Sequence, residues 1–159
     1  MVEACIRCLD PRWRVELEVP VSQPARGVID LVLTDRSSSA TVAAEAQSEV
    51  RRLEQQIRWA SEKADALARR LGIGAQPGVE EPVAVSRLLI LRSTIATRQL
   101  ARVYTATLGA AYPARTADIH ESLTSPRAPW PGPGIIWCQV ERGQAHLMRF
   151  PPRGVSLGR

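Results

Sequence analysis

The apolar residues of this chain change their spacing several times, and these changes predict an alternation of strands and helices. Residues 14–19 alternate between apolar and acidic side chains, which is typical of a half-buried strand. Two short apolar runs, 27–34 and 40–47, predict the second and third strands on either side of a polar turn at 36–39. The most apolar run, 84–91, predicts a strand at the centre of the sheet.

Apolar positions spaced by three and four residues predict two longer helices. Ser48 is a suitable N-cap, and apolar side chains then recur on one helical stripe as far as Leu71. Gly72 can end this helix. A second helix is predicted over residues 94–111, and residues 1–9 predict the end of a short N-terminal helix.

Proline and glycine mark the remaining boundaries. They predict loops over residues 72–82 and 124–134, and two closing strands follow at 135–140 and 146–150 around a turn at Arg142-Gly143. The predicted order is αβββαβαβ, which is an α/β fold with a central mixed β-sheet flanked by helices. We expect one domain over residues 1–150 and a flexible tail over 151–159.

Composition places the chain among globular proteins rather than disordered ones. Its 159 residues are enough for one domain with its own core, and 45% of them are hydrophobic. Three cysteines are an odd number and do not suggest a disulfide framework. No apolar run approaches the roughly 18 residues of a membrane span, so we expect a cytoplasmic protein without membrane contact.

Positive charge is concentrated in the second half of the chain. Residues 1–80 carry 11 basic and 12 acidic side chains, whereas residues 81–159 carry 10 basic and 4 acidic ones. Arg98 and Arg102 would face outward from the second long helix, where they could contact a polyanion. Arginine supplies all but one of the basic residues, a bias typical of high-GC bacterial coding sequences, so a merely solvated arginine surface is an equal alternative.

Two acids near the ends of the second and third strands are the strongest indication of chemistry. Residues two apart on a strand point to the same face, so Glu45 and Gln47 share one face. Asp30 joins them if the two strands pair as a hairpin. Carboxylate oxygens are the ligands that hard divalent cations prefer. The alternatives are that Asp30 pairs with an arginine and that Glu45 is solvated at a sheet edge.

The chain resembles the PD-(D/E)xK nuclease superfamily, whose fold is called restriction-endonuclease-like. The resemblance rests on Arg26-Gly-Val-Ile-Asp-Leu, Glu45-Ala-Gln-Ser-Glu-Val and Trp59-Ala-Ser-Glu-Lys-Ala, and it covers roughly residues 10 to 140. In that fold the acids lie on the second and third strands of the core sheet. More narrowly, the chain is similar to nuclease-like domains of bacterial proteins described as helix-turn-helix regulators.

The resemblance implies metal-dependent hydrolysis of phosphodiester bonds in nucleic acid, with DNA as the expected substrate. Asp30 and Glu45 would bind Mg²⁺, or Mn²⁺ as a substitute, and the carbonyl of Ala46 could add a ligand. The third motif position is usually lysine, but here it is Gln47, which brings no positive charge. Arg51 or Arg52 could partly replace that charge.

Other readings of these residues stay open at this point. The missing lysine favours a lapsed nuclease, or a DNA- or protein-binding regulatory module that keeps the fold without catalysis. Glu18 is a candidate third metal ligand. Trp59 falls outside the apolar stripe of its helix, and an exposed tryptophan often marks a contact surface, so a homodimer or protein partner could bind there.

Overall fold

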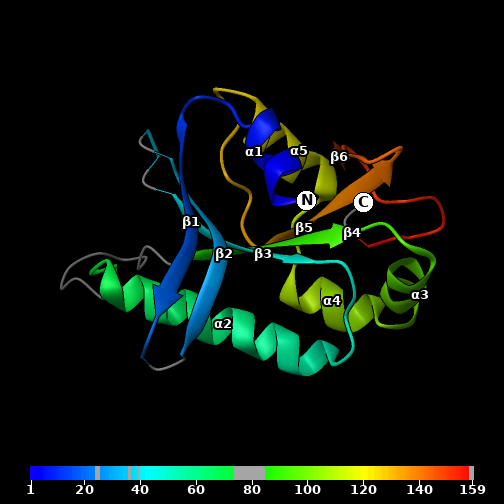
Figure 1. Ribbon diagram of the computed structural model, residues 1–159, viewed down its shortest axis with the longest axis horizontal. Coiled ribbons are helices and arrows are strands. Elements are labelled where there is room, and N and C mark those ends of the chain that lie inside the picture. Colours follow the sequence, from blue (N-terminus) through cyan, green and yellow to red (C-terminus); the bar gives the residue numbers. More distant parts are fainter. Residues whose placement is uncertain (24–25, 36, 39, 74–84, 158–159) are drawn as a thin grey trace.

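The protein is an α/β fold whose β-sheet is covered by helices on both faces (Figure 1). The computed structural model describes residues 1–23, 26–35, 37–38, 40–73 and 85–157. Within them are five helices: α1 (Val2–Cys8), α2 (Leu53–Arg70), α3 (Ile95–Val103), α4 (Thr105–Ala111) and α5 (Thr116–Thr124). The six strands are β1 (Trp13–Val21), β2 (Gly27–Asp35), β3 (Thr41–Gln47), β4 (Ser86–Arg92), β5 (Gly134–Glu141) and β6 (Gln144–Met148).

The six strands form one mixed sheet in sequence order. The first three run antiparallel to one another, β3, β4 and β5 run parallel, and β6 returns antiparallel to β5. The run predicted to be central is β4, and its residues Leu88 to Leu91 are almost completely buried. Helices cover both sides of a parallel pair such as β3 and β4, which explains why this run is continuously apolar.

Two layers of helices enclose the sheet. The core on one face contains residues of α1 and α5 packed on residues from all six strands. On the other face, α2 packs over β1 to β3, and α3 and α4 pack with the first turn of α2 over β4 and β5. Figure 1 shows the same division, with α1 and α5 above the sheet and α2, α3 and α4 below it.

The predicted helix after Ser48 begins later than expected but ends as expected. Its N-cap is Arg52, which makes no side-chain cap hydrogen bond, so the assignment of Ser48 as the N-cap was wrong. At the other end, Gly72 adopts φ +66°, and the amide of Ile73 donates to the carbonyl of Ala68. This Schellman-type ending needs the left-handed conformation that glycine adopts readily.

The helix predicted over 94–111 is instead two helices that meet at Tyr104, whose φ and ψ are −105° and 31°. Thr105 donates its hydroxyl to the carbonyl of Ala101 at 2.7 Å, a contact that bends helices. The short helix α5 was not predicted. Its buried apolar side chains, Ile119 and Leu123, are too few to establish a period.

Other boundaries follow the prediction more closely. Residues 125–133 have no regular structure, and Arg142 and Gly143 turn between β5 and β6 with positive φ. The closing strand lies at Gln144–Met148 rather than at 146–150. Most of the predicted 72–82 loop and part of the 36–39 turn lie outside the described residues.

The segment after β6 packs on the domain instead of extending from it as a flexible tail. Val155 and Leu157 are buried in the core formed with α3 and α4. Arg102 of α3 donates to the carbonyl of Gly154 at 3.0 Å. Two apolar side chains that reach the core supply the attachment that the polar composition of this segment did not suggest.

A buried ion pair joins the beginning of β1 to the end of β2. The guanidinium of Arg12 contacts the carboxylate of Asp35 at 3.1 Å. It also donates to the carbonyl of Ser122, which lies in α5. Burial raises the pKa of Asp35, but hydrogen bonds from Ser38 and Ser37 and the charge of Arg12 outweigh it and hold the pKa below its usual value. Ionised Asp35 therefore stabilises the fold.

We expect Asp35→Asn to lower the free energy of unfolding at pH 7 by about 3 kcal/mol, because it leaves Arg12 buried without its counter-charge. A lowered pKa contributes stability above the unfolded-state value of about 4, and this stability is lost as the pH falls through the folded-state pKa. The difference from wild type should therefore shrink below about pH 4. Urea unfolding between pH 3 and 7 measures it. Glu16→Gln, at an exposed ion pair, is the control.

Candidate functional site

Asp30 and Glu45 lie on neighbouring strands and share one face of the sheet. The antiparallel register pairs Leu31 with Ala44, and its continuation sets Asp30 opposite Glu45. Val32 and Ala43, each two residues from one of the acids, lie in the core beneath α2. Both acids therefore point to the α2 face. The hairpin required by the sequence hypothesis is present.

The side chain of Asp30 takes part in the pairing of these strands. Its Oδ2 accepts a hydrogen bond at 2.8 Å from the backbone amide of Ala46. The regular pairing of β2 with β3 ends at Leu31 and Ala44, so this carboxylate satisfies a β3 amide two residues beyond the last pair. Asp30 is thereby held by β3 itself, and it does not pair with an arginine among the described residues.

Glu45 is buried, and Lys63 of α2 supplies its counter-charge. The ammonium nitrogen of Lys63 donates to both carboxylate oxygens at 2.8 and 2.9 Å and to the carbonyl of Val28 at 2.7 Å. The three contacts join α2 to β2 and β3. A β-carbon at Gly27 would come within 3.1 Å of the Lys63 side chain, so glycine leaves room for the lysine to pass. Glu45 is thus not a solvated edge residue.

The environment of Glu45 raises the pKa of its carboxyl group. Burial makes the largest contribution and raises the pKa of Glu45 above its ordinary value. The hydrogen bond and charge of Lys63 lower the pKa, and the nearby charge of Asp30 raises it. A second cation placed beside the two acids would relieve both the burial penalty and the mutual repulsion.

Sequence reasoning missed the role of Lys63. Lys63 lies within the motif Trp59-Ala-Ser-Glu-Lys-Ala, but the family pattern places its lysine at the position of Gln47. A signal existed, because Lys63 is the chain's only lysine and lies beside Ala64 and Ala60 on the buried stripe of α2. A glutamate inside a buried strand needs a cation, and the adjacent helix is where that cation comes from.

The other predicted site residues are more dispersed. Gln47 ends β3, on the same face as Glu45, and is half-buried. Glu18 lies in β1 with φ +49° and is exposed, at the point where the β1–β2 register is interrupted opposite Asp30. Among the described residues, no group of three or more histidine, cysteine, aspartate or glutamate side chains could hold a metal ion. Glu18 therefore does not complete a three-acid cluster.

The candidate arginines differ in how far they are committed to other contacts. Arg51 pairs with Glu49 at 3.1 Å, and both side chains are exposed. The side chain of Arg52 makes no hydrogen bond or ion pair with the described part of the chain. Arg102 is bound to the C-terminal segment, and Arg98 is half-buried on α3. Arg51 and Arg52, near the start of α2, are thus better placed to contact a nucleic acid than Arg98 and Arg102 of α3.

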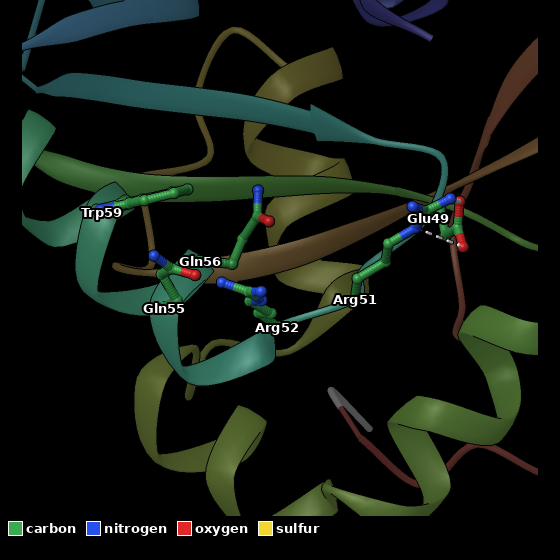
Figure 2. Close-up of a pocket in the computed structure, with 6 residues that line it drawn as sticks. All are labelled: Glu49, Arg51, Arg52, Gln55, Gln56 and Trp59. Carbon is green, nitrogen blue, oxygen red and sulfur yellow. Dashed lines mark hydrogen bonds and ion pairs between the residues drawn. The ribbon is translucent and has the colours of Figure 1, made fainter.

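Two hollows lie along the exposed side of α2. The first, of about 360 Å³, is lined by Glu49, Arg51, Arg52, Gln55, Gln56 and Trp59. Figure 2 shows Trp59 at one end of it and the Arg51–Glu49 pair at the other. The second, of about 280 Å³, is lined by Arg26, Gly27, Val28, Trp59 and Lys63. Trp59 lies between the two hollows, and the second one reaches the lysine that holds Glu45.

We expect Lys63→Met to raise the pKa of Glu45 further, because burial and Asp30 then act on that carboxyl without a compensating cation. Removing one partner of a buried pair should also lower the free energy of unfolding at pH 7 by about 3 kcal/mol. A raised pKa makes this loss largest at high pH and smaller as Glu45 becomes protonated. Carbon-13 NMR of the glutamate carboxyls and urea unfolding at pH 5 and 8 measure both effects.

Arg58→Met is the matched control for that substitution. Arg58 lies on the same helix and makes an exposed ion pair with Glu62 at 3.8 Å. Its replacement should leave the Glu45 titration unchanged. Equal titration curves for wild type and Lys63→Met would contradict the ion pair as the determinant of the Glu45 environment.

Comparison with known proteins does not assign this chain to a family. No family model, no curated protein and no solved structure matches it. In the described part of the chain, no helix is both long and apolar enough to cross a membrane. The functional interpretation therefore depends on the geometry around Asp30, Glu45 and Lys63.

Proposed function

We propose that this chain is a nuclease-like domain that hydrolyses phosphodiester bonds in nucleic acid, with DNA as the expected substrate and Mg²⁺ as the cofactor. The observation that carries the proposal is the convergence of three groups. Asp30 and Glu45 share one face of adjacent strands, and the ammonium of Lys63 meets Glu45 at 2.8 Å. Two acids and one amine are the set of groups that the PD-(D/E)xK resemblance implies.

The donors present fit Mg²⁺. Asp30 and Glu45 offer hard carboxylate oxygens, and the carbonyl of Ala46 is a further oxygen on the same strand. Magnesium is usually held in proteins by one or two carboxylates and keeps several waters, so two acids suffice. When bound, the ion would lower the pKa of a water and offset negative charge on a phosphate. Glu45 is buried and Asp30 is half-buried, which limits the access of bulk water to both carboxylates.

Lys63 takes the role that the family pattern gives to a lysine at the position of Gln47. An amine beside the acids can stabilise negative charge that develops on a phosphate oxygen during hydrolysis. Gln47 lies on the same face and can orient a water through its amide. The missing motif lysine is then a change in where the amine originates, from β3 to α2, and not a loss of the charge.

The sheet topology is compatible with the same proposal. An antiparallel β1–β2–β3 unit is followed by parallel β4 and β5, and the acids lie on the second and third strands. That is where the acids of the restriction-endonuclease-like core lie. A nucleic acid could approach along the α2 hollows, where Arg51 and Arg52 are exposed, with Arg98 as a more distant contact.

One observation favours a non-enzymatic module instead. Both oxygens of Glu45 already accept hydrogen bonds from Lys63, so the carboxylate is satisfied by the protein itself. A lapsed nuclease could keep this ion pair for stability and use its basic surface to bind DNA or a protein partner. The two functions differ in whether the acids are needed for more than folding.

We expect cleavage of plasmid DNA that requires Mg²⁺ or Mn²⁺ and is lost in Asp30→Ala and Glu45→Ala, because each removes a metal ligand. Lys63→Met should reduce the rate by about 100-fold, the usual effect of deleting one group that stabilises transition-state charge. Gel analysis of plasmid nicking with time measures the rate. Glu16→Ala is the control, since Glu16 is an exposed acid of β1 that pairs with Arg14 and lines neither hollow.

A double substitution tests the assignment of Lys63 more sharply. Gln47→Lys returns an amine to β3, so Lys63→Met combined with Gln47→Lys should recover part of the activity that Lys63→Met loses. Thermal unfolding of each variant separates lost activity from lost structure. If folded wild type cuts neither DNA nor RNA with either metal and yet binds them, the domain is a binding module and the enzymatic proposal is wrong.

A further inference from the structure

Trp59 is an exposed aromatic residue on α2, a helix whose other apolar side chains are mostly buried. Its side chain is 49% exposed, whereas Ala60, Ala64 and Leu67 on the same helix are buried. Burying a tryptophan is strongly favourable, so an exposed one that also lines two hollows needs a reason. The indole forms a wall shared by both hollows and is accessible to a flat ligand.

The polar groups around Trp59 are suited to a nucleotide. Gln55 precedes it by four residues and Gln56 by three, so both amides neighbour the indole on the helix surface. Figure 2 shows Arg52, Gln55 and Gln56 between Trp59 and the Arg51–Glu49 pair. Amide groups can donate to and accept from base edges, and an aromatic face can stack on any base.

The charge balance of the hollows favours an anionic ligand. Arg51 is neutralised by Glu49 and Lys63 by Glu45. The guanidinium groups of Arg52, on one side of Trp59, and of Arg26, on the other, have no hydrogen-bond or ion-pair partner among the described residues. These two guanidinium groups, one on each side of the aromatic surface, can contact the phosphates that flank a stacked base.

We infer that Trp59 is a stacking platform for an unpaired base. The two hollows along α2 would then bind a single-stranded nucleic acid. A duplex could offer a base to this platform only where its strands separate, because paired bases already stack on one another. Lys63 follows Trp59 by four residues, about 6 Å of helical rise. A strand stacked on Trp59 would thus pass close to the lysine that contacts Glu45. This inference rests on the proposed function for its ligand class, but its test does not require cleavage.

The experiment measures binding in EDTA, so that hydrolysis by the acid pair cannot contribute. A fluorescently labelled oligonucleotide of 12 thymidines is compared with the same length carrying abasic sites and with its duplex, by anisotropy. Trp59→Ala should weaken binding of the thymidine strand by about 10-fold or more and leave the abasic strand unaffected, whereas Trp59→Phe should keep most of the affinity. Binding of the thymidine strand should also quench tryptophan fluorescence in wild type and not in Trp59→Phe.

Leu71→Ala is the matched control, because Leu71 is 48% exposed and lies at the C-terminal end of the same helix, away from both hollows. It should bind as wild type does. The inference is overturned if Trp59→Ala binds normally, if abasic and thymidine strands bind equally well, or if wild type binds no single strand. Base-dependent binding without metal-dependent cleavage would support the stacking platform and count against the enzymatic proposal, whereas cleavage without base-dependent binding would do the reverse.

Discussion

The contact between Lys63 and Glu45 determines how the candidate site is built. A glutamate in the buried middle of a sheet is unfavourable unless a cation accompanies it. Here the lysine comes from α2, and it also donates to the carbonyl of Val28, so one ammonium joins the helix to two strands. Because α2 is held in place by this contact, the surfaces on its exposed side are held in place too.

The same contact connects the proposed chemistry with the proposed ligand. Asp30 and Glu45 face α2. Trp59 lies on that helix one turn before Lys63, with a hollow on each side. A cation that enters between the acids would compete with Lys63 for the oxygens of Glu45, and the raised pKa of Glu45 indicates that this carboxylate gains from additional positive charge. The ion pair is therefore compatible with a metal site without requiring one.

Two sets of contacts outside the candidate site stabilise the domain. Arg12 and Asp35 join the first hairpin to α5 on the opposite side of the sheet, and Val155 and Leu157 close the core beside α3 and α4. These contacts stabilise the sheet whose second and third strands carry the acids. A substitution in either region should act through folding, whereas a substitution at the exposed Trp59 tests ligand contacts more directly.

Local patterns in the sequence determined the strands, the position of α2 and the shared face of Asp30, Glu45 and Gln47. Alternation and continuous apolar runs report directly on which backbone positions are buried, so the central strand and the exposed Trp59 could be predicted. Such patterns do not show which carboxylate a single lysine meets when the two lie 18 residues apart in the chain. They also missed the break at Tyr104, α5 and the packed C-terminal segment. The break at Tyr104 and the short α5 are local features with too weak a period to be recognised. The Lys63–Glu45 pair and the packed C-terminal segment instead depend on side chains that reach a partner in another element, and only the tertiary structure brings those partners together.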